Sequence, residues 1–157
     1  MPLAVEFNIQ DPASFIDADV IERGVKTVAH AWGTRSGCIS VCVVDDARMR
    51  EVNASYLQHD YTTDCLSFVY DRTEDTIDGE LILCADYAQR EAEAFGWPAT
   101  TELLLYAIHG TLHLMGMDDA TDDGRLAMRQ REREFLMRLN IDGAARHGLS
   151  DNLNPSE

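Results

Sequence analysis

The segment HGTLHLMGMDD, residues 109–119, places two histidines four positions apart and ends in two aspartates. On a helix, side chains at positions i and i+4 leave from the same face, so the imidazoles of His109 and His113 can converge on one point. Zinc uses such nitrogen donors at about 2.0–2.1 Å from the ion. A single histidine is more often an ordinary buried residue, but this pair followed by carboxylates favours a metal site over two histidines of a helix core.

A glycine separates the histidines from the acidic residues. Gly116 can end the helix by adopting a left-handed conformation that other residues resist, and the chain can then turn back toward the histidines. Met117, Asp118 and Asp119 all remain possible third ligands. Three protein ligands would leave a fourth position for water, as in catalytic zinc sites. In the peptidase motif H-E-x-x-H a glutamate serves as general base, and Gly110 stands in its place here, which disfavours an ordinary metalloprotease.

Composition limits the class of protein. The 157 residues suggest one domain, and the N-terminus lacks the basic and apolar run of a secretory signal. The 28 acidic and 13 basic residues give a net charge of −15, which excludes a protein that coats nucleic acid through its overall charge. Any contact with RNA must therefore depend on a local patch or a metal ion. The four cysteines lack zinc-type spacing, and we interpret them as reduced, mostly buried thiols of a cytosolic protein.

Hydrophobic periodicity predicts strands in the first half of the chain and mainly helices in the second. The expected strands cover residues 3–9, 38–44, 65–70 and 79–84, the last two joined by a polar loop over 71–78. The expected helices run from Pro12 to Gly33, from Asp46 to about Tyr56, from Asp86 to Gly96, over 102–114 and over 124–139.

The helix expected over residues 102–114 is apolar almost all round, so it belongs in the middle of the domain. The order of elements predicts an α+β fold, with a small mixed sheet of about four strands covered by helices and a metal site on a buried helix of the C-terminal half. We expect a single domain over residues 1–157, with a core over about 3–141 and a loose tail over 142–157.

Polar residues mark the expected helix starts. Asp86 and Gln89 match a capping box, Thr100 can cap the next helix, and Asp122 and Asp123 can cap the last one.

The last expected helix carries a row of arginines. Arg125, Arg129 and Arg133 recur at intervals of four, with Glu132 and Glu134 between them. We interpret this pattern as a solvated, ion-paired face, with a phosphate-binding track beside the metal loop as the alternative.

Three segments in matching order resemble the YbeY family of bacterial rRNA-maturation factors, metal-dependent single-strand endoribonucleases. Residues 109–119 resemble the family signature H-G-x-L-H-L-x-G-Y-D-H. Residues 52–68, VNASYLQHDYTTDCLSF, resemble LN-x-x-YR-x-x-D-x-PTDVLSF, and residues 78–96 resemble the family's GDI-x-I strand and the helix after it. The resemblance covers roughly residues 3–141, and the histidine motif is its most specific part.

The resemblance implies roles for particular side chains. It implies that His109, His113 and Asp119 bind one divalent ion, zinc, and that the two histidines are catalytic. It further implies that Asp64 and Ser67 line the substrate groove. From the residues alone, a turn-closing acceptor at Asp64 and a backbone-capping hydroxyl at Ser67 are equally good interpretations.

Two departures from the family pattern affect the chemistry. Asp119 stands where the family has a third histidine, and an anionic ligand lowers the charge of the site by one, weakens the ion as a Lewis acid and suits harder ions. Leu57 stands where the family has an arginine thought to engage phosphate, and a leucine cannot bind an anion. The neighbouring Gln58 and His59 could partly compensate, or Leu57 could simply extend the apolar face of its helix. Thr62 also replaces the family's proline.

The leading hypothesis is a cytoplasmic, single-strand-specific, metal-dependent endoribonuclease of rRNA maturation and ribosome quality control. Its partners would be rRNA and small-subunit ribosomal particles, with neither membrane nor DNA expected. One alternative, favoured by Leu57 and the net charge of −15, is a non-catalytic metal-binding factor of ribosome assembly. Another is a metal-dependent hydrolase of a different substrate such as a peptide, which Gly110 disfavours.

Overall fold

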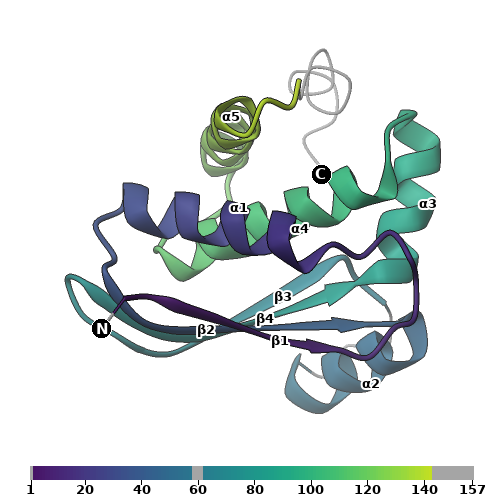
Figure 1. Ribbon diagram of the computed structural model, residues 1–157, viewed down its shortest axis with the longest axis horizontal. Coiled ribbons are helices and arrows are strands. Elements are labelled where there is room, and N and C mark those ends of the chain that lie inside the picture. The colour runs from purple at the N-terminus through teal and green to yellow at the C-terminus, as the bar shows by residue number, and fades with distance from the viewer. Residues whose placement is uncertain (1, 58–61, 143–157) are drawn as a thin grey trace.

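A four-stranded mixed sheet with strand order β1-β2-β4-β3 forms the base of the fold (Figure 1). The computed structural model describes residues 2–57 and 62–142. The strands are β1 (Ala4–Ile9), β2 (Ser36–Val44), β3 (Cys65–Arg72) and β4 (Thr76–Cys84). β2 pairs in parallel with both β1 and β4, whereas β3 pairs antiparallel with β4 and forms one edge of the sheet.

Helices cover both faces of this sheet. They are α1 (Ala18–Ala31), α2 (Asp46–Leu57), α3 (Ala85–Phe95), α4 (Ala99–Leu114) and α5 (Asp122–Arg138). α1 and α4 lie on one face and α2 on the other, while α5 lies over α1 and α4 on the side away from the sheet (Figure 1). This arrangement confirms the predicted α+β class, the four strands and the buried helix in the C-terminal half.

α4 occupies the centre of the domain, as its apolar sequence predicts. Eleven of its sixteen residues are buried, and it packs against α1, α3, α5, β3 and β4. Gly110 permits its close approach to the sheet, because a Cβ atom there would lie only 2.8 Å from both Cys65 Sγ and Leu81 Cδ2. The helix that carries both histidines is therefore held directly against β3 and β4.

The first helix begins later than predicted. Pro12 lies before it, and α1 starts at Ala18 because the Asp17 carboxylate accepts hydrogen bonds from the backbone N–H groups of Asp19 and Val20. Asp17 is thus the N-cap, a position that aspartate favours. The prediction placed the helix start at Pro12 because proline is tolerated in a first helical turn.

Two of the predicted helix caps are also wrong. Asp86 lies inside α3 and accepts a hydrogen bond at 2.9 Å from the backbone N–H of Asp46, so it joins the starts of α2 and α3 instead of closing a capping box. The N-cap position of α3 is Cys84, with no side-chain cap. Thr100 lies within α4, and its hydroxyl donates to the Phe15 carbonyl oxygen at 2.7 Å. Contacts between distant segments have replaced the local ones.

The β3–β4 hairpin is longer than the alternation of residues predicts. Its ladder extends to the pairs Asp71–Asp78 and Arg72–Ile77, which leaves only residues 73–75 as the turn. At its end the Arg72 guanidinium donates to the Leu114 carbonyl oxygen at 2.8 Å, and this bond ties the hairpin to the end of α4.

All four cysteines are free thiols, as predicted, although only Cys84 is buried, while Cys38, Cys42 and Cys65 are partly exposed. Removal of the thiol groups from water raises the pKa of Cys84 to about 11 and that of Cys65 well above its ordinary value, which keeps both as unreactive thiols. Within the described residues, no helix combines the length and the apolar character needed to cross a bilayer.

We predict that Gly110→Ala destabilises the protein. Alanine gains about 1 kcal/mol of helix propensity over glycine, but overpacking a filled core costs about 1–3 kcal/mol, so a net loss is expected in urea unfolding. If contact with Leu81 is the cause, Gly110→Ala combined with Leu81→Val will lose less stability than the two single changes add up to. A stability equal to or above that of the wild type for Gly110→Ala would show that α4 is not closely packed on the sheet.

Candidate metal centre

Three donor atoms converge where α4 ends. The Nε2 atoms of His109 and His113 lie 3.1 Å apart, and each lies 3.5 Å from Oδ2 of Asp119. The side chains are half-buried, with 26% of each histidine and 32% of the aspartate exposed. Among the described residues this is the group of histidine, cysteine and acidic side chains placed to hold a metal ion.

The spacing of these atoms fits a tetrahedral ion. Ligands about 2.0–2.1 Å from a tetrahedral centre lie roughly 3.3–3.4 Å from each other. The observed separations of 3.1, 3.5 and 3.5 Å match this triangle. One point can therefore lie about 2.0 Å from all three donors, the zinc–ligand distance. Two imidazoles and a carboxylate also form a donor set that catalytic zinc sites use.

Each imidazole is oriented through its other ring nitrogen. Nδ1 of His109 lies 2.6 Å from Oε2 of Glu132 on α5, and Nδ1 of His113 lies 3.0 Å from the carbonyl oxygen of Met117. Both partners are acceptors, so each Nδ1 carries a proton, and Nε2 is the atom of each ring that can bind an ion once it is deprotonated. Hydrogen bonds of this kind fix the tautomer and raise the basicity of histidine ligands.

The burial of Glu132 and Arg129 on α5 differs from the sequence interpretation. The pattern predicts a solvated, ion-paired face, but Glu132 is only 4% exposed and Arg129 only 6% exposed. They are covered because α5 packs on α4 with the face that also carries Met128 and Leu136. The apolar neighbours at intervals of three and four residues were the available signal that Glu132 faces inward.

The turn after α4 forms as predicted. Gly116 has a φ of +103°, its N–H donates to the His113 carbonyl oxygen, and the N–H of Met117 donates to Leu112, each at 3.0 Å. This pair of bonds is a Schellman motif, and only glycine adopts its left-handed position without strain. The turn reverses the chain immediately after His113, which allows the next residues to face the histidines.

The structure places Asp119, not Asp118, against the imidazoles. The Asp118 carboxylate accepts a hydrogen bond at 2.9 Å from the backbone N–H of Ala120, so it stabilises the loop locally. The spacing of the residues is compatible with either aspartate as the third metal ligand, and the family resemblance favours Asp119.

The start of α5 differs from the prediction. The N-cap is Thr121, whose hydroxyl accepts from the Gly124 N–H at 3.0 Å. Asp122 and Asp123 lie in the first turn, where carboxylates stabilise the positive end of the helix.

The charges in the centre are strongly coupled. Burial opposes the protonated form of His109, but the hydrogen bond and charge of Glu132, together with Asp64 and Asp119, outweigh it and raise the pKa of His109 to about 9. The pKa of Asp119 is lowered, mainly by its interaction with His113 and by the charges of both histidines. Since an imidazole must lose this proton to bind a metal through Nε2, ion binding at neutral pH displaces a proton from His109.

Of the two residues expected to contact substrate, Asp64 lies near this centre and Ser67 lies on the strand beside α4. Asp64 precedes β3 and is close enough to raise the pKa of His109. Its carboxylate accepts a hydrogen bond at 2.7 Å from the N–H of the next residue, Cys65, a contact within its own segment that does not close a turn. Ser67 lies two residues after Cys65 on β3 and so shares the sheet face that meets α4. No backbone cap by the Ser67 hydroxyl is present among the described residues.

The segment around position 57, where the family has an arginine, differs from one of the two sequence interpretations. Leu57 is the last residue of α2 and is 44% exposed, so it does not extend a buried apolar face. The possible substitutes Gln58 and His59 lie outside the described residues. Thr62, at the family's proline position, donates its hydroxyl to the Asp46 carboxylate at 3.1 Å and so ties this segment to the start of α2.

The comparison with known families decides the relationship. The model of the family described as "Endoribonuclease YbeY" matches residues 7–140. The chain belongs to this family. An endoribonuclease YbeY of Elusimicrobium minutum is 30% identical over 143 residues, which cover 88% of this chain and 100% of the relative. Those of Chlorobaculum parvum and Parabacteroides distasonis are 34% and 38% identical and cover 84% and 82% of the chain, with 92% and 89% of their own lengths matched.

A solved structure supports the fold. The solution structure of a Thermotoga maritima protein aligns with a TM-score of 0.58 over 98% of this chain and 99% of that one, at 18% identity. The likeness at this identity shows the shared architecture alone. The YbeY-family match and this architecture agree with the sheet and helix order described above.

We predict that Glu132→Gln weakens metal binding about 10- to 100-fold, the usual effect of losing a carboxylate that orients a histidine ligand. The matched control is Glu134→Gln on the same helix, since Glu134 pairs with Arg131 at 3.0 Å on the exposed surface. A competition titration of zinc against a chelating dye measures both. Equal affinities for the two variants would contradict the role assigned to Glu132.

Proposed function

We propose that this protein is a metal-dependent endoribonuclease that cuts single-stranded RNA in rRNA maturation and ribosome quality control, at the centre formed by His109, His113 and Asp119. The observation that carries the proposal is the convergence of these three donors, 3.1–3.5 Å apart, inside the segment matched by an endoribonuclease family. We infer that the resident ion is zinc, because the donor triangle has tetrahedral dimensions.

The chain's own groups would prepare the centre for hydrolysis. Glu132 and the Met117 carbonyl group hold the two imidazoles with Nε2 toward the centre, and Asp119 closes the third side. A divalent ion bound there supplies Lewis-acid chemistry, by activating water or by polarising a phosphoryl oxygen. The anionic Asp119 makes this effect weaker than three neutral imidazoles would.

On the substrate side, Asp64 and Ser67 are the proposed contacts. The Ser67 hydroxyl can donate to a phosphate or ribose oxygen, while the Asp64 carboxylate can accept from water or from a 2′-hydroxyl. Both lie at the edge strand β3 or directly before it, beside α4. A flexible single strand can bring its backbone into this half-buried centre, which a rigid duplex reaches less easily.

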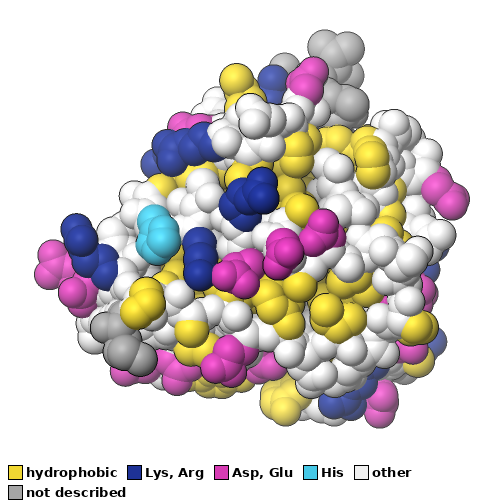
Figure 2. Space-filling model, in the orientation of Figure 1, with side chains coloured by type: hydrophobic (Ala, Val, Ile, Leu, Met, Phe, Trp, Pro, Cys, Tyr) yellow, Lys and Arg dark blue, Asp and Glu magenta, His cyan; other side chains and the backbone are white. Residues whose placement is uncertain are grey.

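The surface supports local rather than bulk attraction of RNA. On the face shown in Figure 2, crossed by α1 and α5, Lys and Arg side chains are interspersed with Asp and Glu. With a net charge of −15, the whole molecule repels phosphate, so recognition must depend on the ion and the groups next to it. By resemblance we infer that rRNA in small-subunit particles is the substrate and the cytoplasm the location.

We predict that His113→Ala loses both the bound ion and cleavage of single-stranded RNA. Asp119→Ala will weaken metal binding and cleavage. Asp118→Ala will keep both, because the Asp118 carboxylate accepts a hydrogen bond from the Ala120 N–H within the loop and does not face the histidines. Elemental analysis and gel assays on the purified variants measure these outcomes. Undiminished cleavage by metal-free His113→Ala protein would contradict the proposal, as would equal effects of the two aspartate variants.

The same assay tests the non-catalytic alternative, which the exposed Leu57 and the acidic surface favour. Metal-loaded wild-type protein that binds RNA but never cuts it would support that alternative and overturn the nuclease.

A further inference from the structure

One row of side chains on α5 faces the metal centre. Arg125, Arg129 and Glu132 are spaced by four and three residues, so they share a helix face. Both ends of the row contact the centre: Oε2 of Glu132 lies 2.6 Å from His109, and Nη1 of Arg125 lies 3.5 Å from the carbonyl oxygen of Asp119. Arg129 lies between them on the same helix face, and from this spacing we expect its side chain to border the centre.

Arg129 is an unusual arginine. It is only 6% exposed, and its Nη2 atom is buried without a hydrogen-bond partner among the described residues. Arginine is rarely buried unless it is paired, because an uncompensated guanidinium is costly to remove from water. A helical side chain leans toward the N-terminus of its helix, so Arg129 reaches toward the loop that carries Asp119. One donor of this buried guanidinium therefore has no acceptor among the described residues.

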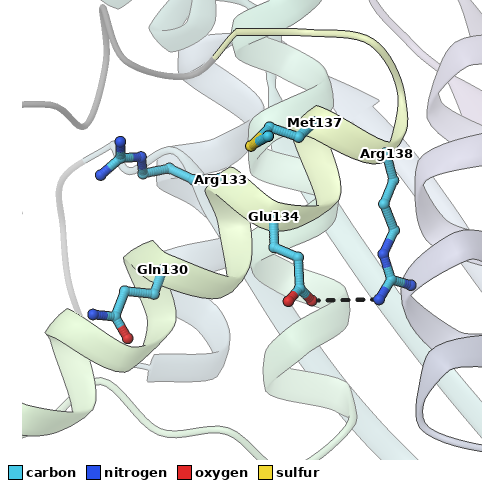
Figure 3. Close-up of a pocket in the computed structure, with 5 residues that line it drawn as sticks. All are labelled: Gln130, Arg133, Glu134, Met137 and Arg138. Carbon is cyan, nitrogen blue, oxygen red and sulfur yellow. Dashed lines mark ion pairs between the residues drawn. The ribbon is translucent and has the colours of Figure 1, made fainter.

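Arg131 and Arg138 of α5 show the contrast. On the outer face of the helix, Arg138 pairs with Glu134 at 3.6 Å (Figure 3) and Arg131 pairs with the same carboxylate at 3.0 Å. These side chains are about half exposed, so they are solvated as well as paired. Among the described residues, the buried guanidinium nitrogens of α5 without a partner are Nη2 of Arg129 and Nε of Arg125, and Arg125 is already paired with Asp122 through Nη2.

The charge of the centre gives this guanidinium a role. The carboxylates of Asp64, Asp119 and Glu132 place three negative charges at or near the site, and a divalent ion offsets two of them. A phosphodiester adds one more negative charge, so the site needs a cation to admit it. Leu57, exposed at the end of α2, contributes none.

We propose that Arg129 binds a phosphate oxygen of the RNA backbone at the metal centre. This inference rests on the proposed nuclease function for its substrate class. Arg129 then resembles other charged groups kept at functional sites: it costs folding stability in the free protein and is compensated when the anionic substrate arrives. A purely structural arginine would show the opposite effect on stability.

The test uses metal-loaded wild-type protein, Arg129→Met, Arg129→Lys and the matched charge control Arg138→Met. A short 2′-O-methyl single-stranded RNA serves as the binding probe, followed by fluorescence anisotropy at several salt concentrations. Loss of one phosphate contact reduces the slope of log K against log salt by about 0.7 for a single strand. We expect this reduction in Arg129→Met, a smaller one in Arg129→Lys and none in Arg138→Met.

Two further readouts separate binding from structure. Arg129→Met will lower kcat/KM for unmodified RNA about 10²-fold, the usual cost of one charge-stabilising donor. It will keep the zinc content and an unfolding temperature, measured without metal, at least equal to that of the wild type, because an unpaired buried charge has been removed.

An unchanged salt slope and kcat/KM in Arg129→Met would overturn the proposal, and so would a lower unfolding temperature combined with loss of zinc, which marks a structural role. If the probe binds with an Arg129-dependent slope but unmodified RNA is never cut, the nuclease proposal fails while the phosphate site stands. Failure of the wild type to bind the probe overturns both.

Discussion

The burial of α4 between the sheet and α5 is the constraint on which the rest of the structure depends. A helix that packs on five other elements has little surface for polar groups, yet it carries His109 and His113. Their ring nitrogens must all be satisfied, because a buried polar group without a partner costs about 1–3 kcal/mol. Glu132 and the Met117 carbonyl satisfy Nδ1 on each ring. The Nε2 atoms are left facing each other and Asp119, an arrangement that a metal ion would complete.

Helix geometry and turn preferences predicted the part of the site that depends on residues close together in the sequence. The spacing of the histidines and the glycine at 116 are consequences of helix geometry, and the structure has both the shared face and the Schellman turn. Glu132 was not recognised, because its contact with His109 spans 23 residues and depends on how α5 is rotated against α4. The wrong caps have the same origin: Asp86 and Thr100 make their hydrogen bonds to residues 40 and 85 positions away. Family resemblance supplied what spacing left open, namely Asp119 as the third donor.

Electrostatics link the two departures from the family pattern. An aspartate at the third position adds a negative charge to a centre that already borders Asp64 and Glu132, and Leu57 at the end of α2 lacks the positive charge of the family's arginine. Such a centre binds a divalent cation well but repels a phosphodiester unless another cation is present. The inner face of α5 provides one in Arg129, with a buried Nη2 that has no partner among the described residues. The acidic surface therefore agrees with an RNA enzyme whose recognition is confined to its metal centre.

The most direct test of this account is X-ray absorption at the zinc edge of protein loaded with one equivalent of zinc. Two imidazole nitrogens at about 2.0–2.1 Å and a carboxylate oxygen at about 2.0–2.2 Å are the predicted ligands. Replacement of Asp119 by alanine should remove the carboxylate and leave the imidazole scattering. Thiolate sulfur at about 2.3 Å, or a spectrum without imidazole scattering, would show that the ion is bound elsewhere and would contradict the central claim.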